Sequence, residues 1–275
     1  MKAFTEARLL QTARVVVVGG LSLVGFMLPL ELGAPLMLLG GAGGSVFGWA
    51  LSRTVAQRWW ARLVWRAQTR VAEAEADPSL MRRLFDDLAE AYRLTNRAPD
   101  WSLRMLSGLV LTAEERWSEA RAALQDLAPA SGRSLADTLI FENTVAWVLA
   151  HAGSTADAVD KAEHTLARAA GHPLELEPEL LGYLHGTLGA ALFLDERPAA
   201  AIPSLRWAIA TGGNDLAQAT RYYYLGMALS ALAEHDEARQ ALTRAHTLAP
   251  ATRWARLADE QLSCRAGSLS LTLIT

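Results

Sequence analysis

The sequence has one cysteine, a modest share of charged residues and almost no net charge. Of its 275 residues, 20% are charged, and the formal net charge is −3. A single cysteine, Cys264, excludes a small scaffold stapled by disulfides. The near-neutral balance argues against a broad nucleic-acid-binding surface, so we predict no nucleic-acid partner. The chain is also 51% hydrophobic, which excludes a disordered tail and leaves enough apolar residues for a sizeable core.

Catalytic signatures are absent as well. The chain contains no H-E-x-x-H zinc motif, no G-K-[ST] phosphate-binding loop and no G-x-S-x-G nucleophile turn. Its six histidines do not stand at metal-ligand spacing with carboxylates, and Cys264 has no partner motif. We therefore expect no catalytic residue, no metal and no cofactor, and we predict that the protein is not an enzyme.

A long apolar stretch lies near the N-terminus. Residues 15–30 and 32–52 carry no charge and are separated by Glu31. Each segment can form a helix about 24–27 Å long, close to the roughly 30 Å of a bilayer's hydrocarbon core. We predict a two-helix transmembrane hairpin over residues 1–53. The alternatives are a buried soluble helix pair and a secretory signal peptide, although residues 32–35 make a poor cleavage site.

Basic residues flank the predicted hairpin on both sides. Residues 1–70 have a net charge of +6, and the remainder has one of −9. By the positive-inside rule, this predicts a bacterial inner-membrane protein with both termini in the cytoplasm. Within the second span, Gly40, Gly44 and Gly48 recur every four residues and let another helix approach closely. That helix is either the first span of the same hairpin or a second copy of the chain, which would make a homo-oligomer.

A basic segment follows the hairpin. Four arginines stand four residues apart, beside a tryptophan, in a stretch with helical periodicity. This predicts a helix along the membrane surface that contacts lipid headgroups; the alternative is a solvated face of the soluble domain. The predicted lipid contacts are Arg58, Trp59, Arg62, Arg66 and Arg70. We assign residues 54–99 to this junction helix and a divergent helix pair, with Ser79 as the N-cap of an amphipathic helix over 79–95.

The rest of the chain is rich in alanine and repeats itself. The pattern Y-x-x-L-G-x-x-L that starts at Tyr222 is followed by A-x-x-x-L-x-x-A from Ala238 and by Pro250. Weaker copies precede it, and the equivalent small residues are Gly108, Ala146, Gly189 and Gly226. Their spacings are 38, 43 and 37 residues, and we expect the extra residues in loops between repeats. This pattern resembles the tetratricopeptide repeat (TPR) family.

The resemblance implies an all-α fold, a TPR-like α-solenoid of helix-turn-helix repeats, here preceded by the two-helix transmembrane hairpin. We expect about four repeats over residues 100–252 and a capping helix and tail over 253–275. We expect the capping helix to end at Cys264 and the tail from residue 266 to pair as a strand with a partner, to fold back into a groove or to fray. In TPR proteins the first helices of the repeats line a concave groove for a partner's peptide or helix. The residues that face this groove by register are Asn143, Trp147, Tyr183, Phe193, Tyr223 and Met227.

The predicted groove is lined by aromatic and apolar side chains. The family's clamp for C-terminal carboxylates needs lysines, an arginine and asparagines, and only Asn143 is present here, so an apolar helix or extended segment is the expected ligand. The alternative is that several of the aromatic residues pack between repeats. The predicted function is a membrane-anchored adaptor that recruits a protein partner at the lipid surface. Two other functions stay open: a periplasm-facing component of an envelope assembly or secretion complex, and an architectural membrane protein that oligomerises through its hairpin.

Overall fold

The described part of the chain is entirely helical. The computed structural model describes residues 77–94, 101–127, 134–172 and 176–272. Within these ranges every regular element is an α-helix, which confirms the all-α prediction for this part of the chain. No helix among the described residues is both long and apolar enough to cross a bilayer.

Several predictions concern other parts of the chain. The transmembrane hairpin, its glycines Gly40, Gly44 and Gly48, and the basic junction from Arg58 to Arg70 lie outside the described residues. The chain divides into two compact units, residues 1–103 and 104–275. The predicted domain boundaries at residues 53, 99 and 252 stay predictions.

In the first unit, helix α3 spans Pro78–Leu94. The carboxylate of Asp77 accepts hydrogen bonds from the backbone N–H groups of Ser79 (2.9 Å) and Leu80 (3.1 Å), which have no partner inside the helix. Asp77 is therefore the N-cap, and the prediction of Ser79 is wrong by two residues. The reason is Pro78, whose fixed φ suits the first helical position and so lets the helix begin one residue before Ser79. The buried face of α3 consists of Met81, Leu88 and Tyr92.

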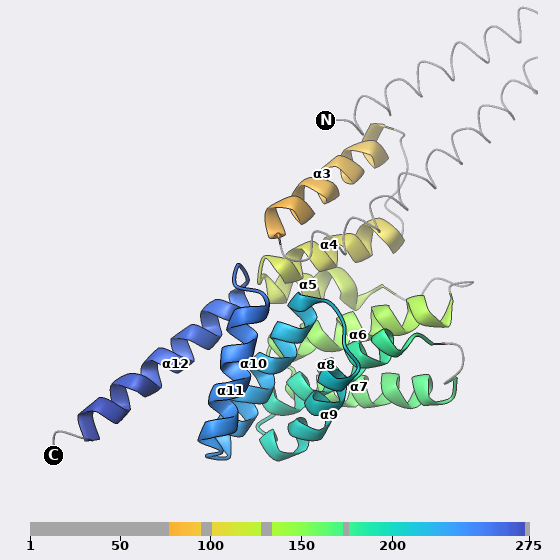
Figure 1. The fold of residues 1–275 in the computed structure, drawn as a ribbon. Helices are drawn as coiled ribbons and strands as arrows, with labels where there is room; N and C mark the ends of the chain where they lie inside the picture. Colours follow the sequence, from red (N-terminus) through yellow and green to blue (C-terminus); the bar gives the residue numbers. More distant parts are fainter. Residues whose placement is uncertain (1–76, 95–100, 128–133, 173–175, 273–275) are drawn as a thin grey trace, which may run out of the picture. The chain divides into compact units, whose positions relative to one another are not determined.

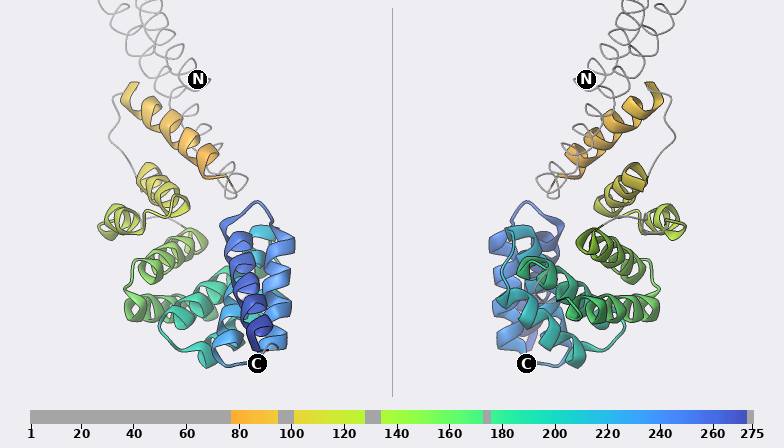
Figure 2. Two further views of the ribbon diagram at one scale, coloured as in Figure 1. Left: turned by 90° about the vertical axis from the view of Figure 1, so that its left-hand side faces the viewer. Right: turned by 90° about the vertical axis from the view of Figure 1, so that its right-hand side faces the viewer.

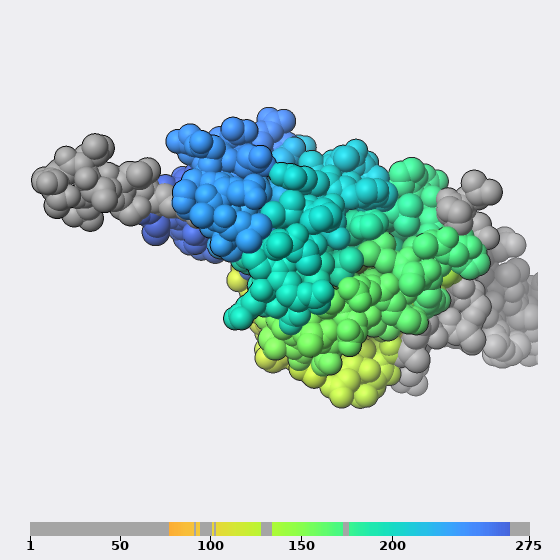
Figure 3. Space-filling view, turned by 90° about the horizontal axis from the view of Figure 1, so that it is seen from below, coloured from red at the N-terminus to blue at the C-terminus, as the bar shows by residue number. Residues whose placement is uncertain are grey.

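The second unit is a series of helical hairpins. Its helices are α4 (Trp101–Ala113, which begins in the first unit), α5 (Trp117–Gln125), α6 (Leu135–His151), α7 (Thr155–Ala170), α8 (Pro178–Leu194), α9 (Pro198–Ala210), α10 (Asp215–Ala231), α11 (His235–Leu248) and α12 (Arg253–Thr272). Helices α6 and α7, α8 and α9, and α10 and α11 pack as neighbouring pairs (Figure 1). The pairs follow one another in chain order from green to blue (Figure 2), and their surfaces adjoin on the face drawn in Figure 3.

Small residues bring the two helices of each pair close together. A Cβ atom added at Gly189 would lie 2.5 Å from the Cγ atom of Leu205, and one at Gly226 would lie 2.7 Å from that of Leu242. Gly108 faces Leu124 in the same way. A small residue on the first helix therefore receives a leucine from the second, as the repeat pattern predicts.

A turn of the same conformation connects the first helix to the second helix in each pair. The second residue after the first helix has a positive φ, and these residues are Glu115 (60°), Gly153 (84°), Glu196 (59°) and Ala233 (62°). The next backbone N–H donates to the carbonyl five residues earlier, at 2.9–3.0 Å, so each first helix ends in a Schellman motif. The turn residues are 38, 43 and 37 positions apart, which matches the spacings of the small residues.

Repeat length varies only after this turn. Helices α6, α8 and α10 have 17 residues each, whereas α7 has 16 and α9 has 13. The long repeat was expected to place its extra residues in a loop, but part of them extend α7. The first helix α4 has 13 residues, so first helices also differ in length. The constant part of the repeat is the stretch from the small residue of the first helix to the turn residue, which is 7 positions in all four repeats.

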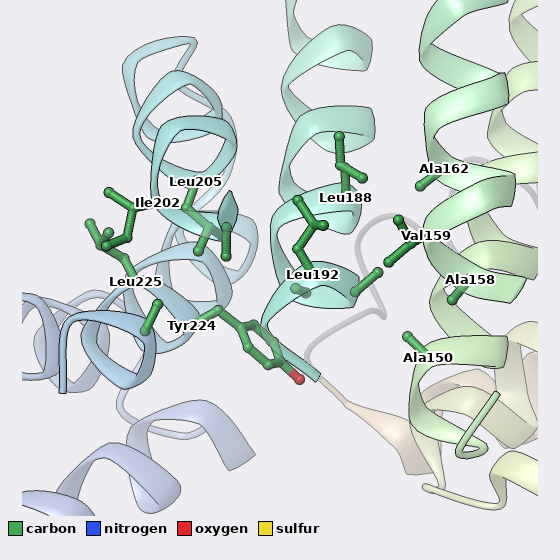
Figure 4. Close-up of a cluster of buried hydrophobic side chains, with 14 of the residues drawn as sticks. Ala150, Ala158, Val159, Ala162, Leu188, Leu192, Ile202, Leu205, Tyr224 and Leu225 are labelled. Atoms are coloured by element: carbon green, nitrogen blue, oxygen red, sulfur yellow. The ribbon is translucent and has the colours of Figure 1, made fainter. Parts of the chain in front are cut away.

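The core of the second unit lies between successive helices. Val159 of α7 packs near Leu188 and Leu192 of α8, and Leu205 of α9 lies beside Leu225 of α10 (Figure 4). These side chains are almost fully buried. The ring of Tyr224 belongs to the same cluster, with its hydroxyl oxygen directed away from α10 (Figure 4).

Helix α12 is longer than predicted. The capping helix was expected to end near Cys264 and to be followed by a strand or a frayed tail, but α12 continues to Thr272. Gly267 is the only strong helix breaker in this stretch, and a single glycine costs a helix only about 1 kcal/mol. The alternating serines and leucines therefore extend the helix. Helix α12 packs against α11 and α10.

Candidate partner-binding face

Aromatic side chains from distant repeats meet on one face of the second unit. We call this group the inner cluster, and its members are Trp117, Trp147, His151, Phe193, Tyr223, Tyr224 and Trp254. The ring of Trp147 on α6 lies 6.0 Å from that of Tyr224 on α10 and 5.9 Å from that of Trp254 on α12. Phe193 on α8 lies 6.0 Å from Tyr224. The first helices of three successive repeats therefore converge on a shared centre.

A hydrogen-bonded pair lies inside the inner cluster. The carbonyl oxygen of Trp147 is 2.9 Å from Nδ1 of His151 and can only accept, so Nδ1 carries the proton. Nε2 of His151 then accepts from the hydroxyl of Tyr224 at 2.7 Å. Burial lowers the pKa of His151 to about 4, so the ring is neutral at pH 7, and burial raises the pKa of Tyr224. A neutral polar pair thus joins α6 to α10 across 73 residues of sequence.

One arginine lies at the edge of the inner cluster. The guanidinium carbon of Arg253 is 4.4 Å from the ring centroid of Trp254 and 5.4 Å from that of Trp117. Its Nη1 atom lies 3.3 Å from Oε1 of Glu115, the turn residue between α4 and α5. Among the described residues, its Nε atom has no hydrogen-bond partner. The first turn of α12 is thereby connected to the first helix pair.

The predicted groove residues fall into two groups. Trp147, Phe193 and Tyr223 belong to the inner cluster, so the alternative of packing between repeats describes their present contacts. Asn143 and Met227 are partly exposed, one helical turn from Trp147 and Tyr223 respectively. We call the surface of α6, α8 and α10 that carries these residues the inner face.

The sixth predicted residue, Tyr183, lies in a different contact. Its hydroxyl accepts a hydrogen bond from Nδ2 of Asn214 at 3.2 Å, and its ring lies 5.3 Å from the guanidinium of Arg221. Partner contact by any of the six residues stays a prediction.

Sequence reasoning missed four members of the inner cluster. His151 and Trp254 were not predicted to share a site with Trp147, and neither were Trp117 and Tyr224. A signal existed for His151, because it follows Trp147 by four residues and so lies on the same helix face. The contact with Trp254 depends on how α12 crosses α10, which no periodicity in the sequence reports.

Arg221 is a buried cation on α10. Its side chain is 3% exposed, and it donates to the carbonyl oxygens of Ala208 (2.8 Å) and Gly212 at the C-terminal end of α9. Gly182 and Gly186 of α8 leave room for it, since a Cβ at either would approach the guanidinium to 3.2–3.3 Å. Burial lowers the pKa of Arg221. The cation is favourable at a helix C-terminus, so its role is to fasten α9 to α10.

Glu142 is the buried anion of this unit. Its Oε1 atom lies 2.6 Å from Nη1 of Arg168 and 3.6 Å from Nζ of Lys161, so it joins α6 to α7. Within the part of the chain that the structure describes, no group of three or more His, Cys, Asp or Glu side chains could hold a metal ion. The absence of enzymatic activity stays a prediction.

Comparison with known proteins identifies the fold. No family model matches the chain, and no curated protein matches its sequence. The solved structures that match include two of PlcR from Bacillus thuringiensis. The apo form shares 14% identity over 83% of this chain and 87% of that chain, with a TM-score of 0.55. The complex with the peptide PapR7 and DNA shares 14% identity over 98% of each chain, with a TM-score of 0.56. The chain therefore has the helical fold of PlcR.

The second match corrects one prediction. PlcR was crystallised with DNA, so a protein of this fold binds nucleic acid, and our exclusion of nucleic acid from the net charge of −3 is wrong. The error has a physical cause. A whole-chain charge averages over separate surfaces, and here residues 1–70 carry +6 while the remainder carries −9.

Proposed function

We propose that this chain is a TPR-type peptide-binding module whose inner face recruits a segment of a protein partner. The observation that carries the proposal is the convergence of aromatic side chains from α6, α8 and α10 on one face, beside the partly exposed Asn143 and Met227. The few residues that dominate the binding energy of protein interfaces are enriched in tryptophan, tyrosine and arginine. The likeness to a structure that contains a peptide supports this reading. We propose no catalytic role.

A selection experiment tests the proposal. Peptides are selected from a phage-displayed library against the full chain in detergent, and their affinities are measured by fluorescence anisotropy. The variant Asn143→Ala/Met227→Ala should weaken binding about 30-fold, because two interface contacts of about 1 kcal/mol each sum to about 2 kcal/mol. The control Asp160→Ala/Arg244→Ala changes exposed residues of the second helices α7 and α11 and should leave affinity unchanged. Equal affinities for both variants would refute the proposal, and so would failure to select a peptide against both the wild type and the variant Arg253→Ala/Trp254→Ala.

The finer proposal is that the module is anchored in the bacterial inner membrane with both termini in the cytoplasm. It is supported by the two uncharged segments over residues 15–52 and the basic residues on either side of them. The periplasm-facing and architectural alternatives differ in topology and in the role of the hairpin. A reporter fused to the C-terminus distinguishes the first, and Gly44→Leu tests the second, because an unchanged oligomer in detergent would exclude assembly through the hairpin.

A second candidate function is nucleic-acid contact by the basic N-terminal residues. Two observations favour it, the +6 charge of residues 1–70 and the DNA in the PlcR complex. The full chain is titrated with a mixed-sequence duplex at about 50 mM and about 200 mM salt. Binding through phosphates would weaken at least ten-fold over this range. The same four arginines, Arg58, Arg62, Arg66 and Arg70, are then changed to glutamine and assayed on duplex DNA and on anionic vesicles. The ligand whose binding falls is the one these residues contact.

A further inference from the structure

We infer that the first turn of α12 is a latch: Arg253 and Trp254 occupy a site on the inner face that takes a basic–aromatic pair of residues from a partner peptide. We call this place the latch site. The inference rests on the proposed function, because the competing ligand is a peptide. It adds the chemistry of that ligand and a mechanism that regulates access.

The indole half of the latch site is formed by three aromatic side chains from two helices, α6 and α10. Trp254 is 6% exposed, and its ring lies 5.4 Å from Tyr223, 5.4 Å from Tyr224 and 5.9 Å from Trp147. Two of these contacts are with residues of α10, and the third is with α6. The walls of this half therefore come from first helices of the repeats, whereas the occupant comes from the segment that follows the last repeat.

The cationic half of the site is formed by the first helix pair. The Arg253 guanidinium stacks over Trp117 at 5.4 Å and pairs with Glu115 at 3.3 Å. Glu115 is well exposed, with 46% of its side chain accessible, and Arg253 keeps 25%. This half is open to solvent, so an incoming cation can replace Arg253 there before the indole is displaced. The net charge of −9 over residues 71–275 also favours a basic ligand.

The latch residues are the first two residues of α12 and follow the short segment 249–252 that connects α12 to α11. Beyond its first turn, α12 packs against α11 and α10. Unwinding of the first turn would withdraw Arg253 and Trp254 together while the rest of α12 keeps these contacts. Because the latch is tethered, its effective concentration at the site is high, and a free peptide binds the wild-type chain weakly.

A displacement experiment on the full chain tests the inference. The probe is a fluorescent peptide that copies residues 249–258, APATRWARLA, and the control peptide has alanine at both latch positions. Arg253→Ala/Trp254→Ala should bind the probe at least ten-fold more tightly than the wild type does, and neither protein should bind the control peptide. A matched variant, Arg206→Ala/Trp207→Ala, removes another Arg-Trp pair whose indole is 41% exposed. It should behave as the wild type.

A milder variant keeps the test valid if the double substitution prevents folding. Arg253→Gln removes the exposed ion pair from the latch side only, leaves Glu115 free to pair with the arginine of the probe, and should raise probe affinity by about two- to five-fold. In the wild type, saturating probe should also speed amide hydrogen exchange over residues 253–258. Equal probe affinity in the wild type and in folded latch variants would overturn the inference. Affinity that varies with protein concentration, through exchange of α12 between two copies, would overturn it in favour of a second copy as the occupant.

The two proposals fail differently. Library peptides that bind the inner face with the same affinity in the wild type and in Arg253→Ala/Trp254→Ala would leave the peptide-binding function intact and remove the latch. If no library peptide binds the wild type and the probe binds neither protein, both proposals fail. If the probe binds only the latch variant, the latch stands, and the wild type is closed to peptides.

Discussion

The first helices of the repeats present two faces that are built differently. Toward the second helices they present glycine and alanine, and leucines such as Leu205 fill the space. Toward the inner face they present rings and a neutral hydrogen-bonded pair, His151 and Tyr224. The first face repeats in every hairpin, whereas the second is assembled once from several hairpins and α12. The comparison shows that small residues and leucines of matching size hold each repeat together. The aromatic and polar side chains gather where different repeats meet.

The largest expected effect on stability is at the face of the first helices that packs against the second helices, which we call the repeated face. Leu205→Ala should lower the free energy of unfolding by about 3 kcal/mol, because Leu205 is fully buried and fills the space left by Gly189. Chemical denaturation monitored by circular dichroism measures the change. The control Ile140→Ala alters a residue of α6 that is 47% exposed and should change stability by less than about 0.5 kcal/mol. Similar losses in the two variants would contradict the packing described here.

Acidic pH should destabilise the fold chiefly by protonating His151 in the inner cluster. The pKa of His151 is about 4 in the folded chain and 6.5 ordinarily, because the ring is buried and faces Arg253. The unfolded chain therefore takes up a proton first, and the stabilisation present above pH 6.5 is lost as the pH falls toward 4. We expect the free energy of unfolding to fall by about 2 kcal/mol between about pH 7 and about pH 4.5.

Two variants check the origin of this pH dependence. His151→Phe should reduce the fall, although a residual slope from His185, whose pKa burial also lowers, should stay. His164→Gln, at an exposed position of α7, should keep the full fall. An unchanged slope in His151→Phe would show that other groups cause the acid sensitivity.

A smaller loss is expected from the hydroxyl of Tyr224. Tyr224→Phe removes the donor to Nε2 of His151 and leaves that nitrogen buried without a partner, at a cost of about 1.5 kcal/mol. Tyr222→Phe, in the same run of three tyrosines, serves as the control and should be nearly neutral. Equal melting temperatures for Tyr224→Phe and the wild type would argue against the buried hydrogen bond.

The smallest expected effect is a gain in stability at the turn between the two helices of a repeat. Ala233 has a φ of 62°, a conformation that costs a residue with a Cβ atom about 1 kcal/mol and costs glycine almost nothing. Ala233→Gly should therefore stabilise the fold by about 0.5–1 kcal/mol. Ala231→Gly, two residues earlier and within α10, should destabilise by a similar amount. Changes of the same sign at both positions would contradict this assignment of the turn.

The repeated face could be predicted from the sequence, because each of its contacts is local. Gly189 and Leu205 are 16 positions apart in one hairpin, and a spacing rule within one repeat is enough to pair them. The N-cap of α3 was displaced by two residues, since Asp77 and Ser79 are both good capping residues and only the geometry of Pro78 separates them.

The inner cluster could be predicted only in part. Register placed Trp147 and Tyr223 on one common face, and both rings do contact Trp254, because the face of a helix follows from its period. Which side chains they contact depends on the angles between successive helix pairs. The periodicity of the sequence does not report those angles. The contact between Arg253 and Glu115 joins residues 138 positions apart and was therefore missed.

The Schellman turn and its fixed distance from the small residue of the first helix have a practical consequence for engineering. Natural variation in repeat length is absorbed by the second helix and by the segments that connect one pair to the next, such as 171–177 and 211–214. Epitopes, fluorescent reporters or a protease site belong in those connections. The same rule sets the unit for grafting: a cassette cut from one Schellman turn to the next carries a second helix, a connection and a complete first helix, so it can be exchanged between arrays of different length.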